Sequence, residues 1–395
     1  MERVNILQIA SVLPAHFKIK KRENDILLTT ARQHMRLNQN VKYTFILTVP
    51  FSSYFLSLLS QKWKEFYLLR RMKIYSYEGF KIHVVAIPTF KNDFFFRKIF
   101  ARISFLFYRK TIEKICINNE INICHAHNIG INAGLAYFIK SNLRIPFCIT
   151  TRDLGRKPLS RHESLYINES NSLISISFRQ KKIADSLHPL SYLIPHGIDD
   201  SYVTARSNFN ESEVLKLVTI SRLLDWKNID TLILALSKLS ERKLRFILDI
   251  YGEGPELSAL QKLVEANGLT NAISFKGVVK HADVSKLLLK YDVFVLVSYP
   301  ETFGRVYVEA IAAGLPIICS KNSGLDGYLT DSMEGFFVDH TDVDALSSVI
   351  TKFFEDRLLK VKMGEKAQKA SKKFFWHNIC KNIDEVYNKV IENGV

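Results

Sequence analysis

Short apolar runs alternate with stretches of helical spacing along the first half of the chain. The apolar runs predict strands at Val4–Val12, Tyr43–Val49, His83–Ile87, Ile121–His125 and Phe147–Thr150. The stretches between them predict helices at Asn24–Asn38 and Ala133–Ser141. Strands that alternate with helices are typical of βαβ units, in which helices cover both faces of a parallel sheet.

The same alternation begins again after Ser201–Glu213, a polar segment typical of a linker. Strands are predicted at Leu215–Ser221, Phe246–Tyr251, Ile273–Gly277, Val293–Ser298 and Ile317–Ser320. Helices are predicted at Ile229–Leu239, Glu256–Asn267, Val284–Lys290 and Arg305–Ala313. We therefore predict an α/β fold of two doubly wound, Rossmann-like domains that face each other across a cleft. Ligands of such folds bind at the carboxyl ends of the strands.

The composition is that of a globular chain, with 47% hydrophobic and 24% charged residues among 395. The five cysteines are scattered and never spaced C-x-x-C, which argues against a disulfide framework or a thiolate zinc site and favours a reducing compartment. No signal-peptide pattern and no run of eighteen apolar residues is present. We expect a chain that is soluble or that lies on a membrane surface.

The net positive charge is confined to the first half. Residues 1–200 hold 30 Lys or Arg against 14 Asp or Glu, whereas residues 201–395 hold 25 of each. A basic domain suits nucleic acid, an anionic membrane or an acidic substrate. No zinc-finger spacing, RNP-like motif or GxxG loop is present, so we do not expect a nucleic-acid partner.

The segment Phe90–Lys110 has six basic residues, one acidic residue and eight aromatic residues. Wound as an α-helix, it carries an apolar stripe of Phe95, Phe96, Ile99, Phe100, Ile103, Leu106 and Phe107. Basic residues gather on the other side, with Phe94 and Phe105 among them. Such a helix either lies at a membrane interface or packs its stripe into the core, and the sequence leaves both interpretations open.

The strongest chemical signal is Tyr299–Pro316, where a buried-type strand leads through a loop into a helix that opens near Gly304. A helix N-terminus offers unpaired N–H groups and a positive dipole end to an anion. Glu301 lies in the entry loop, and Glu309 lies about one turn into the helix. A carboxylate in the position of Glu309 can accept hydrogen bonds from vicinal ribose hydroxyls.

Three other strand ends carry weaker signals. Arg222 and Lys227 follow the strand that ends at Ser221, and as a guanidinium and an ammonium they can clamp a diphosphate. Gly252, in Tyr-Gly-Glu-Gly-Pro, permits a close backbone approach, although a plain strand-to-helix turn explains it equally well. At Val278, which follows the predicted strand Ile273–Gly277, the backbone can contact the edge of a nucleotide base.

His125 and His127 alternate on one strand end and therefore face the same side. They can line a cleft or ligate a metal, and the lack of a third ligand at a suggestive spacing favours the cleft. We therefore expect no metal site.

These motifs resemble those of a known family. Ser-Arg-Leu-x3-Lys at Ser221, Tyr-Gly-Glu-Gly-Pro-Glu at Tyr251, Phe-x-Gly-Val at Phe275 and Glu-Thr-Phe-Gly-x4-Glu-Ala-x-Ala-x-Gly-x-Pro at Glu301 have the order and spacing of retaining glycosyltransferases of the GT-B fold. Glycosyltransferase family 4 (glycosyl transferases group 1) is the most similar. The resemblance is dense over residues 215–340, and in the first half only His125–His127, Pro146–Thr150 and Ile194–Asp199 fit.

The resemblance implies a role for each motif. Arg222 and Lys227 would hold the donor diphosphate, and Glu309 the ribose. Glu301, with the backbone of Thr302, Phe303 and Gly304, would hold the donor sugar; Gly252 and Val278 would lie beside the nucleotide. It also implies a domain of residues 1–200 that takes the acceptor and includes a C-terminal helix at about 375–395, and a donor domain of residues 201–374.

The chain departs from the family pattern in three places. Pro14–Lys21 stands where the family has a glycine pair, and Gly327 stands where it has a glutamate. Arg152 replaces a histidine in Thr150-Thr-Arg-Asp153, so Arg152 and Asp153 join His125 and His127 as candidates for the sugar and acceptor side. These differences bear on the sugar and the acceptor and leave nucleotide binding intact.

We therefore expect a retaining, metal-independent hexosyltransferase without a cofactor. It would move a sugar from a nucleoside-diphosphate sugar to a hydroxyl of a saccharide or lipid-linked saccharide, in the synthesis of a cell-surface polysaccharide. The basic half predicts a cytoplasmic enzyme that is peripheral on the inner face of an anionic membrane. Two alternatives remain open: a GT-B-fold nucleotide-sugar epimerase, and a catalytically silent nucleotide-sugar-binding protein at the membrane.

Overall fold

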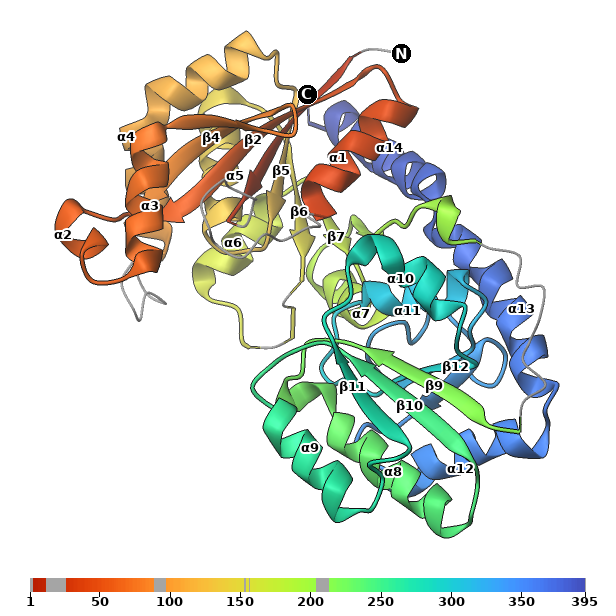
Figure 1. Cartoon of the computed structure of the whole chain (residues 1–395). Coiled ribbons are helices and arrows are strands. Elements are labelled where there is room, and N and C mark those ends of the chain that lie inside the picture. The colour runs from red at the N-terminus through yellow and green to blue at the C-terminus, as the bar shows by residue number, and fades with distance from the viewer. Residues whose placement is uncertain are drawn as a thin grey trace. The chain divides into compact units, whose positions relative to one another are not determined.

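The computed structural model describes residues 3–11, 26–88, 97–152, 154–155, 157–203 and 213–394. They form two compact units, each built on its own sheet (Figure 1). Unit 1 comprises Met1–Ile176, Gln180–Pro195 and His377–Val395, and unit 2 comprises Ser177–Arg179 and His196–Trp376. The predicted α/β class with two doubly wound, parallel-sheet units is confirmed.

The sheet of unit 1 has the strand order β3-β4-β2-β1-β5-β6-β7-β8. Its strands are β1 (Val4–Ala10), β2 (Val41–Pro50), β3 (Ile74–Tyr77), β4 (Phe80–Ile87), β5 (Ile123–His127), β6 (Phe147–Thr151), β7 (Ser172–Ser175) and β8 (Ser191–Leu193). Neighbouring strands are parallel except for the antiparallel hairpin β3–β4, which turns at Glu78 and Gly79. The order reverses between β1 and β5, which is the position where doubly wound folds place ligands.

Helices cover both faces of this sheet. They are α1 (Ile26–Leu37), α2 (Tyr54–Ser57), α3 (Gln61–Met72), α4 (Arg97–Asn118), α5 (Ile131–Leu143), α6 (Arg161–Glu169), α7 (Phe178–Leu187) and the chain's last helix, α14 (Trp376–Glu392). One core cluster joins the sheet to α4 and α5, and a second joins it to α1 and α3. None of the described helices is long and apolar enough to cross a membrane.

Helix α14 is tied to unit 1 by side-chain hydrogen bonds. An oxygen of Asp384 lies 2.7 Å from Nε2 of the fully buried His34 and accepts a hydrogen bond from Asn38. The hydroxyl of Tyr387 lies 2.7 Å from Nδ1 of His125 on β5. The last helix of the chain therefore completes the unit that the first strand begins.

The sheet of unit 2 is parallel throughout, with the order β11-β10-β9-β12-β13-β14. Its strands are β9 (Leu215–Ile220), β10 (Phe246–Tyr251), β11 (Ile273–Gly277), β12 (Val293–Leu296), β13 (Ile317–Ser320) and β14 (Gly335–Val338). Its helices are α8 (Ile229–Glu241), α9 (Leu257–Ala266), α10 (His281–Leu288), α11 (Arg305–Ala312), α12 (Val343–Glu355) and α13 (Leu359–Ser371). Strands buried on both faces need apolar runs, which is why the hydrophobic pattern located them.

Helix α4 contains the described part of the aromatic and basic segment; its first residues, up to Phe96, lie outside the described residues. The described part of the predicted stripe is divided: Ile99, Ile103 and Leu106 are exposed and Phe107 is 82% exposed, whereas Phe100 is buried in the core. Phe105, which the helical pattern placed among the basic residues, is only 1% exposed. Its ring stacks on Phe138 of α5, with centroids 5.9 Å apart.

The orientation of α4 predicts opposite outcomes for two neighbouring phenylalanines. Phe105→Ala should lower the free energy of unfolding by about 3–5 kcal/mol, because it opens a cavity between α4 and α5. Phe107→Ala should change it by less than about 0.5 kcal/mol, because an exposed ring loses few contacts. Urea unfolding of both variants, followed by circular dichroism, measures the difference. Equal losses would contradict the orientation of α4.

Candidate functional site

The residues predicted to bind the donor gather at one edge of the sheet in unit 2. Arg222 and Lys227 follow β9, Gly252 follows β10, Val278 follows β11, and the loop with Glu301 follows β12. These four strands are neighbours in the order β11-β10-β9-β12, and all are parallel, so their carboxyl ends meet at the same edge. The strand order reverses between β9 and β12, which places Lys227 and Glu301 at the switch point of the sheet.

The backbones of three of these strand ends approach closely at Gly252. Its N–H donates to the carbonyl of Gly277 at 2.8 Å, and the N–H of Ser221 donates to Tyr251 at 3.0 Å. Gly252 has φ +135°, and a Cβ there would lie 1.7 Å from the carbonyl oxygen of Ser221. Glycine is therefore required, because any side chain would displace the backbone that carries Arg222.

Lys227 and Glu301 form an ion pair at the switch point. Nζ of Lys227 lies 2.5 Å from Oε2 of Glu301, and both side chains are largely shielded from solvent. The hydroxyl of Ser298 donates to the same oxygen at 3.2 Å, and the N–H of Thr302 donates to Oε1 at 3.1 Å. The carboxylate is thus held by three donors from the loops after β9 and β12.

Helix α11 begins directly after this loop. Its N-cap is Gly304, with φ +73°, and a Cβ there would lie 2.4 Å from the ring of Tyr307. Tyr307 is buried and donates to the carbonyl of Leu296 on β12 at 2.6 Å, so its ring cannot easily move away. The side chain of Phe303 is buried as well, so what this loop can offer a ligand is its backbone, as the sequence predicted for Thr302–Gly304.

Glu309, on the second turn of α11, is buried among partners that the sequence analysis did not predict. Its Oε1 lies 3.0 Å from Nε2 of His281 and 3.7 Å from a guanidinium nitrogen of Arg305. The hydroxyl of Tyr202 lies 3.4 Å from the same histidine nitrogen, and burial together with the charge of Glu309 raises the pKa of Tyr202. The four-residue spacing of Arg305 and Glu309 was a usable signal, but His281 and Tyr202 are brought in by tertiary packing alone.

Two predicted residues lie at the surface of the same edge. Arg222 is exposed, and its side chain makes no hydrogen bond or ion pair with any residue that the structure describes, although its carbonyl accepts from the N–H of Leu224. Val278 is exposed in the loop after β11. The structure therefore brings Lys227 and Glu301 together directly and leaves the Arg222 guanidinium available beside them on the same strand end.

The two predicted histidines of unit 1 lie on β5, at the switch point of that sheet. Their rings stack with centroids 4.4 Å apart, and both are buried. Besides its contact with Tyr387, His125 lies 2.6 Å from the Thr150 hydroxyl through Nε2. Burial, and to a lesser degree the charge of Arg152, lowers the pKa of His125 to about 3, so its ring is neutral near pH 7. His125 ties α14 to the sheet, and its place beside a bound sugar stays a prediction.

Arg152 directly follows β6, and its carbonyl accepts a hydrogen bond from the amide of Gln180. Asp153 lies outside the described residues. Within the described ranges, no group of three or more His, Cys, Asp or Glu side chains is arranged to hold a metal ion.

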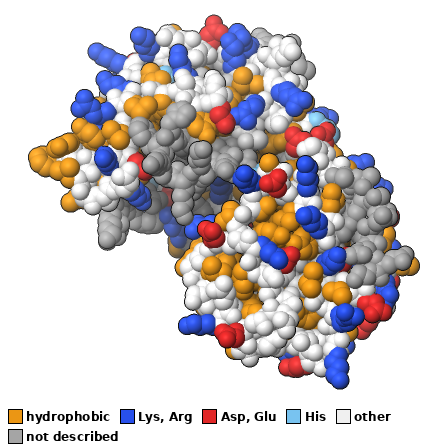
Figure 2. All heavy atoms as spheres, viewed as in Figure 1, with side chains coloured by type: hydrophobic (Ala, Val, Ile, Leu, Met, Phe, Trp, Pro, Cys, Tyr) orange, Lys and Arg blue, Asp and Glu red, His pale blue; other side chains and the backbone are white. Residues whose placement is uncertain are grey.

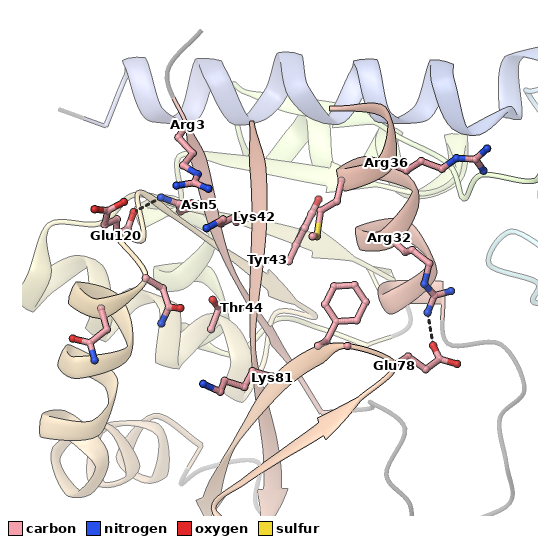
Figure 3. A pocket seen from close by; sticks show the side chains of 15 residues that line it. Arg3, Asn5, Arg32, Arg36, Lys42, Tyr43, Thr44, Glu78, Lys81 and Glu120 are labelled. Carbon is pink, nitrogen blue, oxygen red and sulfur yellow. Dashed lines mark hydrogen bonds and ion pairs between the residues drawn. The ribbon is translucent and has the colours of Figure 1, made fainter. Parts of the chain in front are cut away.

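A separate basic pocket of about 720 Å³ lies in unit 1 at the amino ends of β1, β2 and β4 (Figure 3). Arg3, Lys42 and Lys81 line it. Arg32 pairs with Glu78 across one side. The pocket is far along the strands from their carboxyl ends, so we do not include it in the candidate site.

Comparison with known proteins finds a family model that is similar to the second half of the chain. Residues 204–370 match the family model of glycosyl transferases group 1. The match includes the four strand ends described above.

Two relatives and one solved structure extend the match. The phosphatidylinositol N-acetylglucosaminyltransferase gpi3 subunit of Schizosaccharomyces pombe is 24% identical over 331 residues, which are 80% of this chain and 70% of that protein. The GDP-mannose-dependent alpha-(1-6)-phosphatidylinositol monomannoside mannosyltransferase of Mycobacterium tuberculosis is 26% identical over 52% of this chain and 59% of its own length. Anabaena HepE, solved in complex with UDP, has a similar fold, with a TM-score of 0.71, 18% identity and coverage of 98% of this chain and all of that one.

The close approach at Gly252 predicts a loss of stability that a matched glycine does not share. Gly252→Ala should cost about 1–3 kcal/mol for overpacking against Ser221, in addition to backbone strain. Gly277→Ala is the control: Gly277 has φ +70° but no atom within 4 Å of an added Cβ, so only a left-handed strain of about 1–2 kcal/mol applies. Urea unfolding of the two variants measures the difference, and equal stability would disprove the close approach.

Proposed function

We propose that this chain, a glycosyltransferase of the group 1 type with the GT-B fold, transfers a hexose from a nucleoside-diphosphate sugar to a hydroxyl of a lipid-linked saccharide, with retention at the anomeric carbon. The observation that carries the proposal is the ion pair of Lys227 with Glu301 at the switch point of unit 2. This ion pair places two groups side by side at the carboxyl ends of β9 and β12: an ammonium that can bind the leaving diphosphate and a carboxylate that can bind sugar hydroxyls.

The charge of the leaving nucleoside diphosphate explains why two cationic side chains lie at this site. When the glycosidic bond to the donor phosphate breaks, the nucleoside diphosphate gains negative charge, and groups that bind this charge lower the barrier. The exposed guanidinium of Arg222 gives a two-pronged donor, and Lys227 gives an ammonium. The free N–H groups at the start of α11 add a positive dipole end. With these charges in place, we propose that the reaction needs no metal ion.

The carboxylates explain how the donor is oriented. Lys227 is paired with Glu301 in the structure, so a diphosphate that attracts the ammonium leaves Glu301 to accept hydrogen bonds from sugar hydroxyls. At Glu309 both side-chain partners use Oε1, and we assign Oε2 to the ribose hydroxyls. Each carboxylate thus has one role in binding and one in structure.

The proposed retention rests on the resemblance to retaining glycosyltransferases, and the residues of the site bear on the route by which it occurs. A covalent route needs a carboxylate placed to attack the anomeric carbon. Glu301 is the candidate by position, yet it is held by Lys227, Ser298 and the Thr302 N–H. We therefore favour departure of the diphosphate and attack of the acceptor hydroxyl on the same face of the sugar.

The acceptor and the location are inferred from charge and from the relatives. Both relatives described above carry phosphatidylinositol in their names, which supports a lipid-linked acceptor for this chain. The first 200 residues hold an excess of 16 positive charges, which suits an anionic bilayer. We propose that the enzyme works at the inner face of the cytoplasmic membrane on a precursor of a cell-surface polysaccharide. UDP, bound by HepE, is the first nucleotide to test.

The leaving-group assignment predicts kinetics that differ between the cations and the ribose carboxylate. Arg222→Ala and Lys227→Ala should each lower kcat by roughly 10²–10³, because each removes charge that acts mainly in the transition state. Glu309→Gln should mainly raise the donor KM, because ribose contacts are similar in the ground and transition states. Steady-state transfer, with the donor chosen by thermal shift, measures both effects.

Arg245→Ala is the matched control for these kinetics, because Arg245 is 71% exposed and precedes β10 at the other edge of the same sheet. Its kcat should stay within about twofold of wild type. An Arg222→Ala/Lys227→Ala double variant that transfers sugar at the wild-type rate would disprove the site assignment.

The proposed mechanism also predicts the product and its metal dependence. With an anomerically pure donor and excess EDTA, transfer should continue at the wild-type rate and give a glycoside of the donor's configuration. The anomeric proton coupling, read by NMR, reports the configuration. An inverted product would contradict same-face attack. Loss of activity that manganese or magnesium restores would contradict the metal-free leaving group.

A further inference from the structure

A second pocket, of about 840 Å³, lies in unit 1 between the end of α3, the edge of β4 and α4. We call it the α3–α4 groove. Its lining is amphiphilic, with cationic Arg70, Arg71 and Lys73 on one side and apolar Ile103 and Phe107 on the other. None of these residues belongs to the candidate site described above.

The groove exists because the edge strand of the sheet is short. β3 pairs with β4 only over Phe80–His83, and the N–H of Val84 then donates to the carbonyl of Lys73 at 2.7 Å. The rest of β4, up to Ile87, pairs with β2 on one side, and on the groove side no further described strand lies beside it.

Three polar side-chain atoms around the groove are buried without a hydrogen-bond partner in the described structure: Nε of Arg70, Nδ1 of His83 and Oγ of Ser104. Ser104 is only 1% exposed, so its hydroxyl has little access to bulk water. A buried polar atom without a partner needs an explanation, and a ligand in the groove supplies one explanation for three atoms that belong to the same lining. A guanidinium N–H and a hydroxyl both donate, so the ligand they suit is a hydrogen-bond acceptor such as a phosphate.

Apolar side chains continue from the groove across the surface to α2. Arg70 lies over the ring of Phe51, at 4.3 Å from its centroid, and over Tyr67, whose ring packs against Tyr54 on α2 at 6.0 Å. Phe55 is 79% exposed on α2. Leu58 and Leu59, which follow it, are exposed as well. Figure 2 shows these hydrophobic side chains gathered over α2 at the left edge of unit 1.

Positive charge accompanies this apolar surface. Lys62 and Lys64 are exposed on α3 beside α2, and Arg71 and Lys73 are exposed at its other end. The one acidic residue of α3, Glu65, is buried. Exposed apolar side chains ringed by cations, without exposed acids, are the pattern of a protein surface that inserts shallowly into an anionic bilayer.

We infer that the α3–α4 groove binds one anionic phospholipid from the bilayer. The phosphate lies against Arg70, Arg71 and Lys73, and an acyl chain runs along Ile103 and Phe107, while Phe55 and the leucines after α2 enter the headgroup layer. This inference rests on the proposed membrane location of the enzyme, and it adds a lipid site apart from the donor and acceptor. Bound lipid holds unit 1 at the membrane, where a lipid-linked acceptor is found.

The test uses short-chain phosphatidylglycerol below its micelle concentration and native mass spectrometry of the full chain. Wild type should bind one lipid in a saturable way. Arg71→Ser, which removes an exposed cation, should weaken binding about fivefold or more. Ile103→Trp, which fills the groove but keeps its surface apolar, should weaken it at least as much.

Matched controls lie on unit 2. Arg245→Ser removes an exposed cation, as Arg71→Ser does, and Leu358→Trp enlarges an exposed apolar side chain, as Ile103→Trp does. Both should bind the lipid as wild type does. If Ile103→Trp fails to fold, as shown by circular dichroism, Arg71→Ser decides, because that side chain is exposed.

Three results would overturn the lipid site: no adduct with wild type, binding unchanged in both groove variants, or glycerol phosphate binding as tightly as the lipid. The last would mean that the groove recognises a free phosphate. Transfer to a water-soluble acceptor separates this inference from the proposed function. If only the lipid site is wrong, that transfer still occurs; if the proposed function is wrong, no acceptor is glycosylated whatever the groove binds.

Discussion

The candidate site depends on the pairing of β9 with β12, two strands that are neighbours in the sheet but far apart in the chain. Because β10 and β11 extend the sheet on one side of β9 and β13 and β14 extend it beyond β12, the carboxyl ends of β9 and β12 meet where no crossover helix covers them. Lys227 and Glu301 stand 74 positions apart in sequence and 2.5 Å apart in space for this reason. No local preference of either loop would bring them together.

The same edge is packed at the level of the backbone. Glycine at position 252 lets β9 and β10 end against each other, and glycine at 304 lets α11 start over the Tyr307 ring. Because neither glycine has a side chain, a ligand can approach the backbone at both positions. This edge of the sheet therefore presents backbone N–H groups and the charged ends of a few side chains. A site that is packed in this way is ordered before a ligand binds, which lowers the entropic cost of binding.

Much of this was readable from the sequence. Strands β10, β11 and β13 have the predicted bounds, and α11 ends within one residue of its prediction, because strands buried on both faces are apolar runs and glycine and proline mark the ends of elements. Helices α2 and α3 and strand β3 were not predicted, since they are short or polar and lie at the edge of the sheet, whereas the predicted strand His83–Ile87 is the second part of β4. The orientation of α4 was unpredictable for another reason: the helix is aromatic on both sides, and only its packing against α5 decides that Phe105 is buried and Phe107 exposed.

For the site, motif spacing located Lys227, Glu301 and Glu309, whereas the contact of His281 with Glu309 depends on packing between elements.

The position of α14 has a consequence for the order in which the chain takes shape during synthesis. His34 and His125 leave the ribosome long before their partners on α14, Asp384 and Tyr387. Unit 2 holds nearly all its residues in one continuous stretch, from His196 to Trp376, and can close while translation continues. Unit 1 starts before unit 2 and needs α14, which follows unit 2, so a nascent chain passes through a stage in which unit 2 is complete while His34 and His125 each lack one partner, the side chain that α14 supplies.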